Sequence, residues 1–485
     1  MEVVKQSMRQ PHSVRVGEFV QTLGQAGRMA AGAIWNRGGG GLVTGVSRAR
    51  VVQGDTQIPE QTDVVVIGGG IVGCLTALTL AERGVRVLLC EKGVIAGEAS
   101  GRALGYVESQ FLDPAKLEIV ARSKTLWAGM NERVQGETGY RITGLATFFT
   151  SNEGLDSARQ WLDDMTGAPG IDARIVGAAE AAELAMGAAT PFAGALYQPG
   201  DGCVEPQLAA PAIADAVRRA GGVVVQHCAV RGVEIAGGAV VGVVTELGAV
   251  RCQAVVLAGG AWSPVMARSL GLDLPQFMAF SGVARVSPGH GPDVATIAAE
   301  AGFAMRRTID GAFDMCTAVG SSPILPGTLR NLFRLGPAMR NMGSQLRPVF
   351  NLSTFMEEWR IPTRWALDKP SPFEQRRILM PETRTAFLHG VVDKVTNFFP
   401  MLALTARLEQ WSGALTSTLD NMPVISGVAQ VPGLYLGTGF YYGLTMAPAA
   451  GEALADLVLG QTPRIDLTSF RYERFSDGSP IVFRA

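Results

Sequence analysis

A glycine-rich stretch between two apolar runs constrains the fold of this chain more than any other feature. The stretch reads DVVVIGGGIVGCLTALTLAERGVRVLLCEKG and occupies residues 63–93. It opens with a short apolar run, Val64 to Ile67, which glycines end in the way that is typical of a buried parallel strand. Apolar residues then recur at helical spacing from Cys74 to Arg83, and a second apolar run follows from Val85 to Cys90. The stretch therefore predicts one strand–helix–strand unit.

The glycines of this unit have the spacing of a dinucleotide-binding turn. Gly68, Gly70 and Gly73 form the pattern G-x-G-x-x-G, and Glu91 lies 23 residues after the first of them. The first glycine permits a tight turn, the second lets the backbone approach a pyrophosphate, and the third lets helix pack on strand. The helix N-terminus offers free N–H groups to the phosphates, and the acid can accept hydrogen bonds from a ribose diol. The unit predicts a dinucleotide site but does not by itself separate FAD from NAD.

Composition and charge exclude several other classes of protein. The chain has 485 residues and a net charge of −1, which argues against general nucleic-acid binding. Its six cysteines are scattered without a C-x-x-C pair, and none of its four histidines are paired at metal-ligand spacing. This pattern disfavours a metal site and indicates buried thiols in a reducing compartment.

No stretch has the roughly 18–20 uncharged apolar residues of a membrane span. No uninterrupted apolar core follows a basic start, so residues 1–60 are interpreted as an N-terminal extension without a clear signal peptide. We therefore expect a cytoplasmic protein.

Two later glycine-rich regions return to the α/β pattern. An apolar run from Ala254 to Leu257 ends in Ala258-Gly259-Gly260, which makes Gly260 a second candidate cofactor contact. Near the end of the chain, a strand from Leu434 to Leu436 leads to Gly437 and Gly439, with a helix starting near Thr445. The predicted fold is α/β: a Rossmann-like domain assembled from discontinuous segments, with an interleaved α+β substrate domain. The nucleotide segments are 61–140, 200–270 and 385–485, and the substrate segments are 141–199 and 271–384. This interleaving favours FAD over NAD.

The chain also resembles a known group of flavoproteins, the D-amino-acid oxidase superfamily, which includes glycine and sarcosine oxidases. Within that superfamily the likeness is greatest to the bacterial membrane-associated L-amino-acid deaminases, and it covers residues from about 61 to 475. The stretches that carry it are DVVVIGGGIVG, AERGVRVLLCEKGVIAGEASGR, VVLAGGAWS, PSPFEQRRIL, EQWSGALTSTLDNMPVIS and LGTGFYYGLTMAPAAGE. The first occurs in many flavoproteins, whereas the second and fifth are much narrower.

The resemblance implies a set of FAD contacts. It assigns the AMP half of FAD to the glycine turn and Glu91, the adenine to the strand at Val230, and the flavin to the loop after the second strand and the last glycine loop. Those last two segments contain Ser100, Gly101, Arg102, Gly439, Gly443, Leu444 and Thr445. Some sarcosine oxidases attach flavin through a cysteine in the segment that matches SGALTSTLD. This chain has no cysteine there, so we expect non-covalent FAD.

The resemblance also implies the reaction. Enzymes of this superfamily remove a hydride equivalent from a carbon that bears a neutral amine, and the imine is then hydrolysed. We therefore expect a dehydrogenase or oxidase that deaminates an amine or amino acid and passes electrons to a membrane quinone. The alternatives are a soluble oxidase that uses O2, a 2-hydroxy-acid dehydrogenase on the same fold, and a non-catalytic flavoprotein subunit.

The substrate residues depart from the deaminase pattern. There an arginine that follows a D-G-x-[FY] turn pairs with the substrate carboxylate, and here Ala318 stands at that position. Arg285, Arg306 and Arg307 are candidate replacements. Acids in the segments that approach the substrate would suit a cationic amine. The candidate catalytic residues are Arg102, Glu108, Asp314 and Tyr442, and the candidate aromatic walls are Tyr106, Phe313, Tyr441 and Tyr442.

Residues 322–356 combine arginines with leucine, phenylalanine and methionine and contain no acid. Arg330, Arg334, Arg340 and Arg347 lie in this segment. The composition is typical of an interfacial segment, and the membrane deaminases carry an insertion at the same place. The segment predicts peripheral contact with the inner face of the cytoplasmic membrane; a lid or a dimer contact is the alternative.

Overall fold

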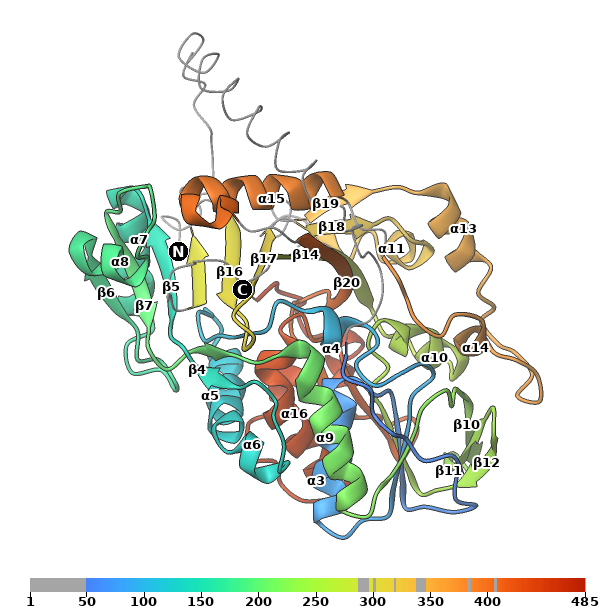
Figure 1. Ribbon diagram of the computed structural model, residues 1–485. Helices are drawn as coiled ribbons and strands as arrows, with labels where there is room; N and C mark the ends of the chain where they lie inside the picture. The colour runs from blue at the N-terminus through green and yellow to red at the C-terminus, as the bar shows by residue number, and fades with distance from the viewer. Residues whose placement is uncertain are drawn as a thin grey trace.

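The computed structural model describes residues 49–286, 296–299, 302–317, 320–336, 346–381, 385–404 and 408–484. Two sheets dominate the molecule, and Figure 1 shows a smaller helix-covered sheet below a larger one. The predicted α/β class, with a Rossmann-like part and an interleaved second part, is confirmed.

The smaller sheet contains the predicted strand–helix–strand unit. In spatial order its strands are β21 (Val424–Gly427), β22 (Leu434–Thr438), β13 (Ala254–Leu257), β1 (Val64–Ile67), β2 (Val87–Cys90) and β9 (Val223–Val225). All neighbours are parallel except β21 and β22. The strands are short runs of buried β-branched and aliphatic residues, as expected for a sheet that is covered on both faces. Strands far apart in sequence therefore meet at one edge.

A group of helices packs on this sheet. They are α3 (Ile71–Glu82), α4 (Ala99–Arg102), α5 (Pro114–Ala128), α6 (Met130–Arg133), α9 (Pro206–Arg219) and α16 (Gly443–Val458). Helix α3 is apolar almost all round because it contacts α9 on one side and α16 on the other. Gly451 permits the second contact, since a Cβ there would lie 2.8 Å from the Cβ of Leu75. The last helix of the chain is thus held against the first glycine turn.

Two three-stranded sheets flank this core. One is the antiparallel meander of β10 (Val230–Ala236), β11 (Ala239–Thr245) and β12 (Gly248–Arg251). The other contains β3 (Tyr106–Val107), β8 (Gly202–Cys203) and β4 (Arg141–Ile142). In sequence, these strands lie where the chain passes from the smaller sheet to the larger one and back. The segment before β1 packs on helix α9: Arg50 pairs with Asp215 of α9 at 2.6 Å, and Asp55 pairs with Arg218 of α9 at 2.9 Å.

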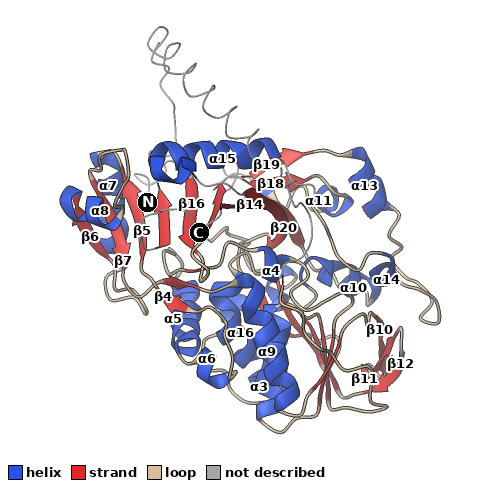
Figure 2. Ribbon diagram, in the orientation of Figure 1, coloured by secondary structure: helices blue, strands red, loops and turns tan. Residues whose placement is uncertain are grey.

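The larger sheet forms the second part. Its strands in order are β19 (Leu346–Val349), β18 (Gly320–Pro323), β14 (Gln276–Val286), β17 (Phe313–Thr317), β16 (Phe303–Arg307), β15 (Thr296–Ala299), β5 (Leu145–Phe149), β7 (Gly194–Gln198) and β6 (Arg174–Gly177), and β20 (Leu408–Thr418) pairs with β14. Helices α7 (Asn152–Asp164) and α8 (Ala178–Leu184) flank one end, and α15 (Thr385–Phe398) covers a face. Figure 2 shows these helices along the outer side of the sheet.

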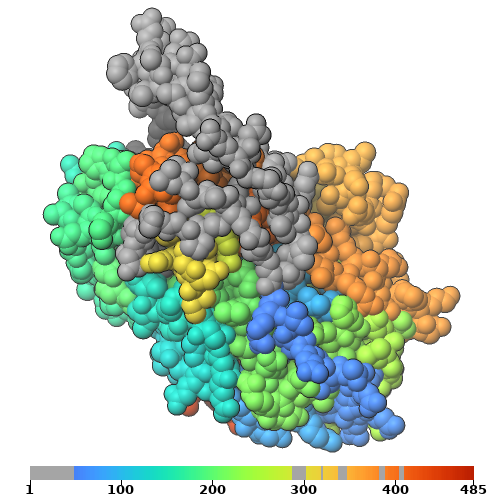
Figure 3. Space-filling view, viewed as in Figure 1, coloured from blue at the N-terminus to red at the C-terminus, as the bar shows by residue number. Residues whose placement is uncertain are grey.

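Short helices surround the end of this sheet at β19. They are α10 (Ser263–Ser269), α11 (Pro326–Arg330), α13 (Leu352–Trp359) and α14 (Pro372–Gln375). Residues 346–381, gold to orange in Figure 3, form one edge of the molecule. The 3-10 turns are η1 (Gly260–Trp262), η2 (Pro400–Leu404), η3 (Thr468–Phe470) and η4 (Tyr472–Phe475). In the part of the chain that is described, no helix combines the length and the apolar character needed to cross a bilayer.

The expected boundary at residue 385 needs a correction. Helix α15 contacts β14, β16 and β17, and β20 pairs with β14 from Leu408 to Thr418. Both elements therefore belong to the larger sheet. The last segment of the smaller sheet begins after β20, because β21 is the next strand to join that sheet.

Candidate functional site

A cavity of about 480 Å³ lies between the two sheets. One end is bounded by the carboxyl ends of β1, β2 and β13, where an open α/β sheet places its ligand. The other end is bounded by residues of β14, β16, β17 and β20, so the larger sheet forms its roof. The start of α16 forms a side wall.

The glycine turn forms the floor at the nucleotide end. Gly68 has a φ of +113°, a conformation that side chains rarely adopt. A Cβ on Gly73 would lie 2.0 Å from the carbonyl oxygen of Gly68, so only glycine lets α3 pack this closely on β1. Gly70 stands immediately before α3, and the atom nearest to a Cβ added there would be the Ser100 hydroxyl oxygen, at 3.2 Å. The N-terminus of α3 therefore faces the cavity, with the Ser100 hydroxyl as the nearest side-chain atom.

Glu91 lies beside this turn and is held by the backbone. Its carboxylate accepts hydrogen bonds from the N–H groups of Gly69 and Gly93, both at 2.7 Å. Burial raises the pKa of Glu91. The same carboxylate lines the cavity, where it can accept further hydrogen bonds from a sugar diol.

Helix α4 brings Ser100 and Arg102 to the cavity. The Ser100 hydroxyl accepts a hydrogen bond from the N–H of Ile71 at 2.9 Å, which fixes α4 on the glycine turn. Arg102 is 5% exposed and donates from Nη1 to two carbonyl oxygens, those of Leu379 and Ser412, at 3.3 Å each. Its Nε and Nη2 are buried and have no hydrogen-bond partner among the described residues. A guanidinium with two such donors suits a ligand that carries oxygen acceptors.

Six further predicted cofactor residues line the cavity, whereas Gly101 does not: they are Val230, Gly260, Gly439, Gly443, Leu444 and Thr445. Thr445 connects this wall to the loop opposite. Its hydroxyl donates to the carbonyl oxygen of Tyr106 at 3.2 Å and accepts from the N–H of Glu108 at 3.4 Å. The start of α16 therefore positions the segment that contains both of those side chains.

Glu108 is a titratable cavity residue below the larger sheet whose pKa is strongly shifted. Burial, together with the charge of Asp201, raises the pKa of Glu108 to about 7. Tyr106, Tyr441 and Tyr442 line the cavity with it, and burial raises the pKa of Tyr441 to about 12. The ring of Tyr442 packs against that of Tyr441 with centroids 5.0 Å apart. This end combines one carboxyl group with aromatic walls.

Asp314, however, does not line the cavity. It is fully buried and pairs with Arg285 at 2.6 Å and with Arg306 at 2.9 Å. Both arginines are engaged in this network and neither lines the cavity, so the expectation that they or Asp314 face the substrate is corrected. The predicted aromatic wall residue Phe313 lies instead in the core that the larger sheet buries.

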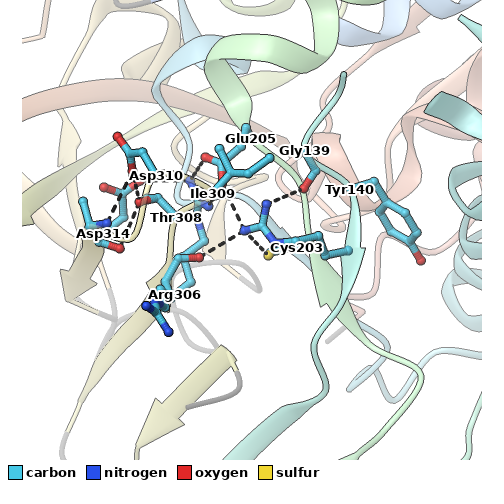
Figure 4. A network of polar contacts seen from close by, with 12 residues as sticks. Gly139, Tyr140, Cys203, Glu205, Arg306, Thr308, Ile309, Asp310 and Asp314 are labelled. Carbon is cyan, nitrogen blue, oxygen red and sulfur yellow. Dashed lines mark hydrogen bonds and ion pairs between the residues drawn. The ribbon is translucent and has the colours of Figure 1, made fainter. Parts of the chain in front are cut away.

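The network around Arg306 connects the two parts of the molecule. Arg306 of β16 pairs with Glu205, directly before α9, at 2.8 and 2.9 Å, and its Nε donates to the carbonyl oxygen of Leu104. Glu205 also accepts from Arg141 at 3.1 Å and from the N–H of Ile309 at 2.8 Å (Figure 4). Although burial alone would raise the pKa of Glu205, its hydrogen bond with Arg306 lowers it. Because Leu104 lines the cavity, the network supports the cavity wall from behind.

The structure does not place two of the predicted substrate positions at the cavity, and three residues that do line it were not predicted. Ala318 lies outside the described residues, and Arg307 is an exposed residue with interactions of its own. Sequence reasoning missed Lys92, Glu98 and Trp262, which form one side of the nucleotide end. The indole Nε1 of Trp262 donates to Glu98 at 3.0 Å, and Lys92 pairs with Glu98 at 2.8 Å. All three lie in stretches that carry the family resemblance, AERGVRVLLCEKGVIAGEASGR and VVLAGGAWS. The sequence did not show that these side chains contact one another.

Comparison with known proteins agrees with this geometry. The pattern of the DAO family, described as FAD dependent oxidoreductase, matches residues 63–457. Among solved structures, the chain is similar to L-amino acid deaminase from Proteus myxofaciens in complex with anthranilate: the TM-score is 0.85 and the identity 35%, over 90% of this chain and 99% of the other. Among curated proteins, it is 28% identical to the glycine oxidase of Pseudomonas aeruginosa over 83% of this chain and 96% of that protein. It is 24% identical to the mitochondrial sarcosine dehydrogenase of Homo sapiens, of which it spans 44%.

The cavity fits the cofactor that this family uses. The glycine turn leaves the N-terminus of α3 open to a pyrophosphate, and Glu91 is fixed beside it. The unpartnered donors of Arg102 lie at the wall between the nucleotide end and the larger sheet. The chain belongs to the DAO family of FAD dependent oxidoreductases.

Proposed function

We propose that the protein oxidises the C–N bond of an amine to an imine and that Glu108 binds the ammonium group of the substrate. The observation that carries this proposal is the charge at the roof of the cavity. Among the described lining residues, the charged ones are Glu91, Lys92, Glu98, Arg102 and Glu108. The first three lie at the nucleotide end, and Arg102 lies at the wall between that end and the larger sheet. The remaining charged group of the lining, below the larger sheet, is Glu108.

Two of the candidate arginines of the larger sheet, Arg285 and Arg306, are already paired. Arg285 and Arg306 each bind Asp314, and Arg306 also binds Glu205. A carboxylate placed beside Glu108 would be repelled by it and would have no arginine opposite among the described roof residues. An amine without a carboxylate therefore suits this end better than an α-amino acid does.

The raised pKa of Glu108 also suits a proton transfer. FAD would supply the hydride acceptor when bound, and the substrate nitrogen must be neutral before the hydride equivalent leaves. Above a pH of about 7 Glu108 is ionised, attracts the ammonium group and is placed to accept its proton. Tyr106 and Tyr442 keep the surrounding wall largely apolar, which strengthens the attraction between the two charges.

Flavin reduction without oxygen tests the substrate class. Matched pairs are compared, such as phenethylamine with phenylalanine and 3-methylbutylamine with leucine, and lactate serves as the hydroxy-acid control. We expect the amines to bleach the flavin faster than their amino acids, and Glu108→Gln to slow amine oxidation chiefly through KM. Fast bleaching by phenylalanine or leucine, with no effect of Glu108→Gln, would overturn the amine assignment. Fast bleaching by lactate alone would favour the hydroxy-acid dehydrogenase.

We further propose how FAD is held. Gly68, Gly70 and the N-terminus of α3 would hold the pyrophosphate, and Glu91 would hold the ribose. Arg102 and the start of α16 would hold the flavin. The contacts in support are those of the glycine turn, the fixed carboxylate and the unpartnered guanidinium. FAD content measured by absorbance after Arg102→Met tests the last contact, and we expect a weaker affinity in a folded protein.

For the electron acceptor we propose a membrane quinone, reached by docking of residues 322–356 on the bilayer. Large apolar side chains of α11, α13 and the adjoining loops are exposed: Leu329, Leu332, Phe333, Phe350, Leu352 and Trp359. Phe333 is 97% exposed, which is costly in water and favourable in a bilayer. Arginines nearby would each contribute on the order of 1 kcal/mol on an anionic surface.

Vesicle co-sedimentation tests this docking. The wild type should sediment with phosphatidylglycerol vesicles, and Phe333→Ser with Trp359→Ser should not. Val482→Ser is the matched control, since Val482 is a 59% exposed apolar residue elsewhere on the chain. Peroxide measured with and without membranes separates a quinone-using enzyme from an oxidase. A wild type that stays in the supernatant and makes peroxide at full rate would overturn the membrane proposal.

A further inference from the structure

A second cavity lies beside the first, in the corner between α10, α11 and α13. Its volume is about 240 Å³, and Ala261 lines both cavities. Figure 1 shows these three helices at the same end of the larger sheet. The charged residues of its lining are Arg268, Asp273, Arg330, Arg334 and Glu358. The proposed chemistry of the first cavity requires none of them.

The charges in this second cavity are only partly paired. Arg334 pairs with Asp273 at 2.7 Å. For Arg268, Arg330 and Glu358, the described residues provide no ion-pair partner within 4.0 Å. The Nε of Arg268 is buried and has no hydrogen-bond partner among those residues. Arg330 donates from Nε to the carbonyl oxygen of Pro326, at 3.4 Å, so its Nη groups are available.

The two unpaired arginines face the same space from different helices. Arg268 belongs to α10 and Arg330 ends α11. Burial lowers the pKa of Arg268, the charge of Arg330 lowers it further, and the charge of Glu358 acts in the opposite direction. The two guanidinium groups line the same cavity, are close enough for their charges to repel, and have no ion-pair partner among the described residues. An anion between them would relieve both effects.

We propose that this second cavity binds a phosphate group through Arg268 and Arg330. A phosphate suits two guanidinium groups on separate helices because its oxygens can accept from both at once, whereas a carboxylate is filled by one bidentate arginine. Thr328 and Asn331 of the same lining add polar groups at the mouth. Glu358 opposes an anion when it is ionised; burial raises the pKa of Glu358, and the charges of Arg376, Arg268 and Arg330 lower it.

The surroundings indicate a phospholipid headgroup as the source of the phosphate. Leu329 and Leu332 stand on either side of the Arg330 turn and are exposed, and Trp359 is exposed directly after Glu358. A lipid whose phosphate enters the cavity would place its chains beside these side chains. This choice of lipid rests on the membrane docking proposed above, whereas the phosphate site itself does not.

The binding experiment uses the full chain with its FAD and two soluble probes. These are inorganic phosphate and dihexanoylphosphatidylglycerol below its micelle concentration, both followed by calorimetry. Arg268→Gln and Arg330→Gln should each weaken binding by about tenfold, the size expected for a lost charge-assisted hydrogen bond. Glu358→Gln should tighten binding because it removes a negative charge. Arg360→Gln is the matched control, because Arg360 directly follows α13, is exposed and does not line the cavity.

The outcomes separate the parts of the proposal. The site is overturned if neither probe binds, if both arginine variants behave like Arg360→Gln, or if Glu358→Gln weakens binding. Tighter binding of the lipid than of inorganic phosphate, with the same dependence on Arg268 and Arg330, supports the headgroup; equal affinities overturn the lipid source. The flavin spectrum and melting temperature of each variant establish that it is folded.

Vesicles distinguish this site from the docking surface. Arg268→Gln and Phe333→Ser are compared in co-sedimentation with phosphatidylglycerol vesicles. If the soluble lipid binds through Arg268 but the wild type ignores vesicles, docking fails and the phosphate site stands. If Phe333→Ser abolishes sedimentation while Arg268→Gln changes neither sedimentation nor lipid affinity, docking stands and the site fails.

Discussion

Replacing Arg306 by methionine should destabilise the protein by about 3 kcal/mol. The Arg306 side chain is fully buried between Glu205 and Asp314, and removing one partner of a buried ion pair typically costs about 3–5 kcal/mol. Here each acid keeps a second arginine, because Glu205 retains Arg141 and Asp314 retains Arg285. The loss should therefore lie at the lower end of that range.

The assay is thermal unfolding followed by circular dichroism. With an unfolding entropy of about 2.1 cal/mol/K per residue, a chain of 485 residues loses on the order of 1 °C per kcal/mol, so Arg306→Met should melt about 3 °C lower. The control is Arg159→Met, because Arg159 pairs with Asp156 across exposed side chains that are 51% and 67% accessible. That variant should melt like the wild type. Equal melting temperatures for Arg306→Met and wild type would refute the view that the network stabilises the fold.

Three further results are expected. Burial raises the pKa of Glu108 from its usual 4.5 to about 7, so the folded state keeps a proton that the unfolded chain loses, and stability should fall as pH rises between these values. Glu108→Gln should remove that fall, which is at most about 3 kcal/mol, in urea titrations at pH 5 and 8. Gly73→Ala should yield little FAD-loaded protein by absorbance, since its Cβ would meet the Gly68 carbonyl oxygen at 2.0 Å; full loading would contradict the close packing. Acid precipitation should release the flavin into the supernatant, because burial raises the pKa of the Cys316 thiol at the cavity wall to about 12 and keeps it protonated; flavin in the pellet would show a covalent bond.

The nucleotide end was predictable because its signals are local. Strand β1, the glycine turn and α3 follow one another within residues 64–82, and each has its own periodicity or spacing. Glu91 follows at the end of the next strand. The assignment of residues 385–418 failed for the opposite reason. The partner of β20 is β14, more than a hundred residues away, and an alternating run does not reveal which sheet it joins.

The acids near the substrate end show what the sequence leaves open. Glu108 and Asp314 both lie in segments that approach the cavity, and the carboxylate of either residue could attract the ammonium group of an amine. The register of the larger sheet separates them: Asp314 stands opposite Arg285 on β14 and opposite Arg306 on β16. A carboxylate between two arginines on neighbouring strands is neutralised within the sheet. Among the described residues Glu108 has no such cross-strand partner, and its side chain lines the cavity.

The Arg306 network and the cavity meet at Gly105. The residue has a φ of +104°, and a Cβ there would lie 2.8 Å from the Nε of Arg306. Glycine thus lets the guanidinium reach the backbone at Leu104, on the loop that leads from Arg102 to Tyr106 and Glu108. The larger sheet therefore positions the cavity loop through a buried charge, while the start of α16 holds the same loop through Thr445. Because these two supports come from opposite parts of the molecule, a shift between the sheets would move Glu108 relative to the flavin. The paired charges thus have a use beyond stability: they help to hold the Glu108 carboxylate in place relative to the glycine turn.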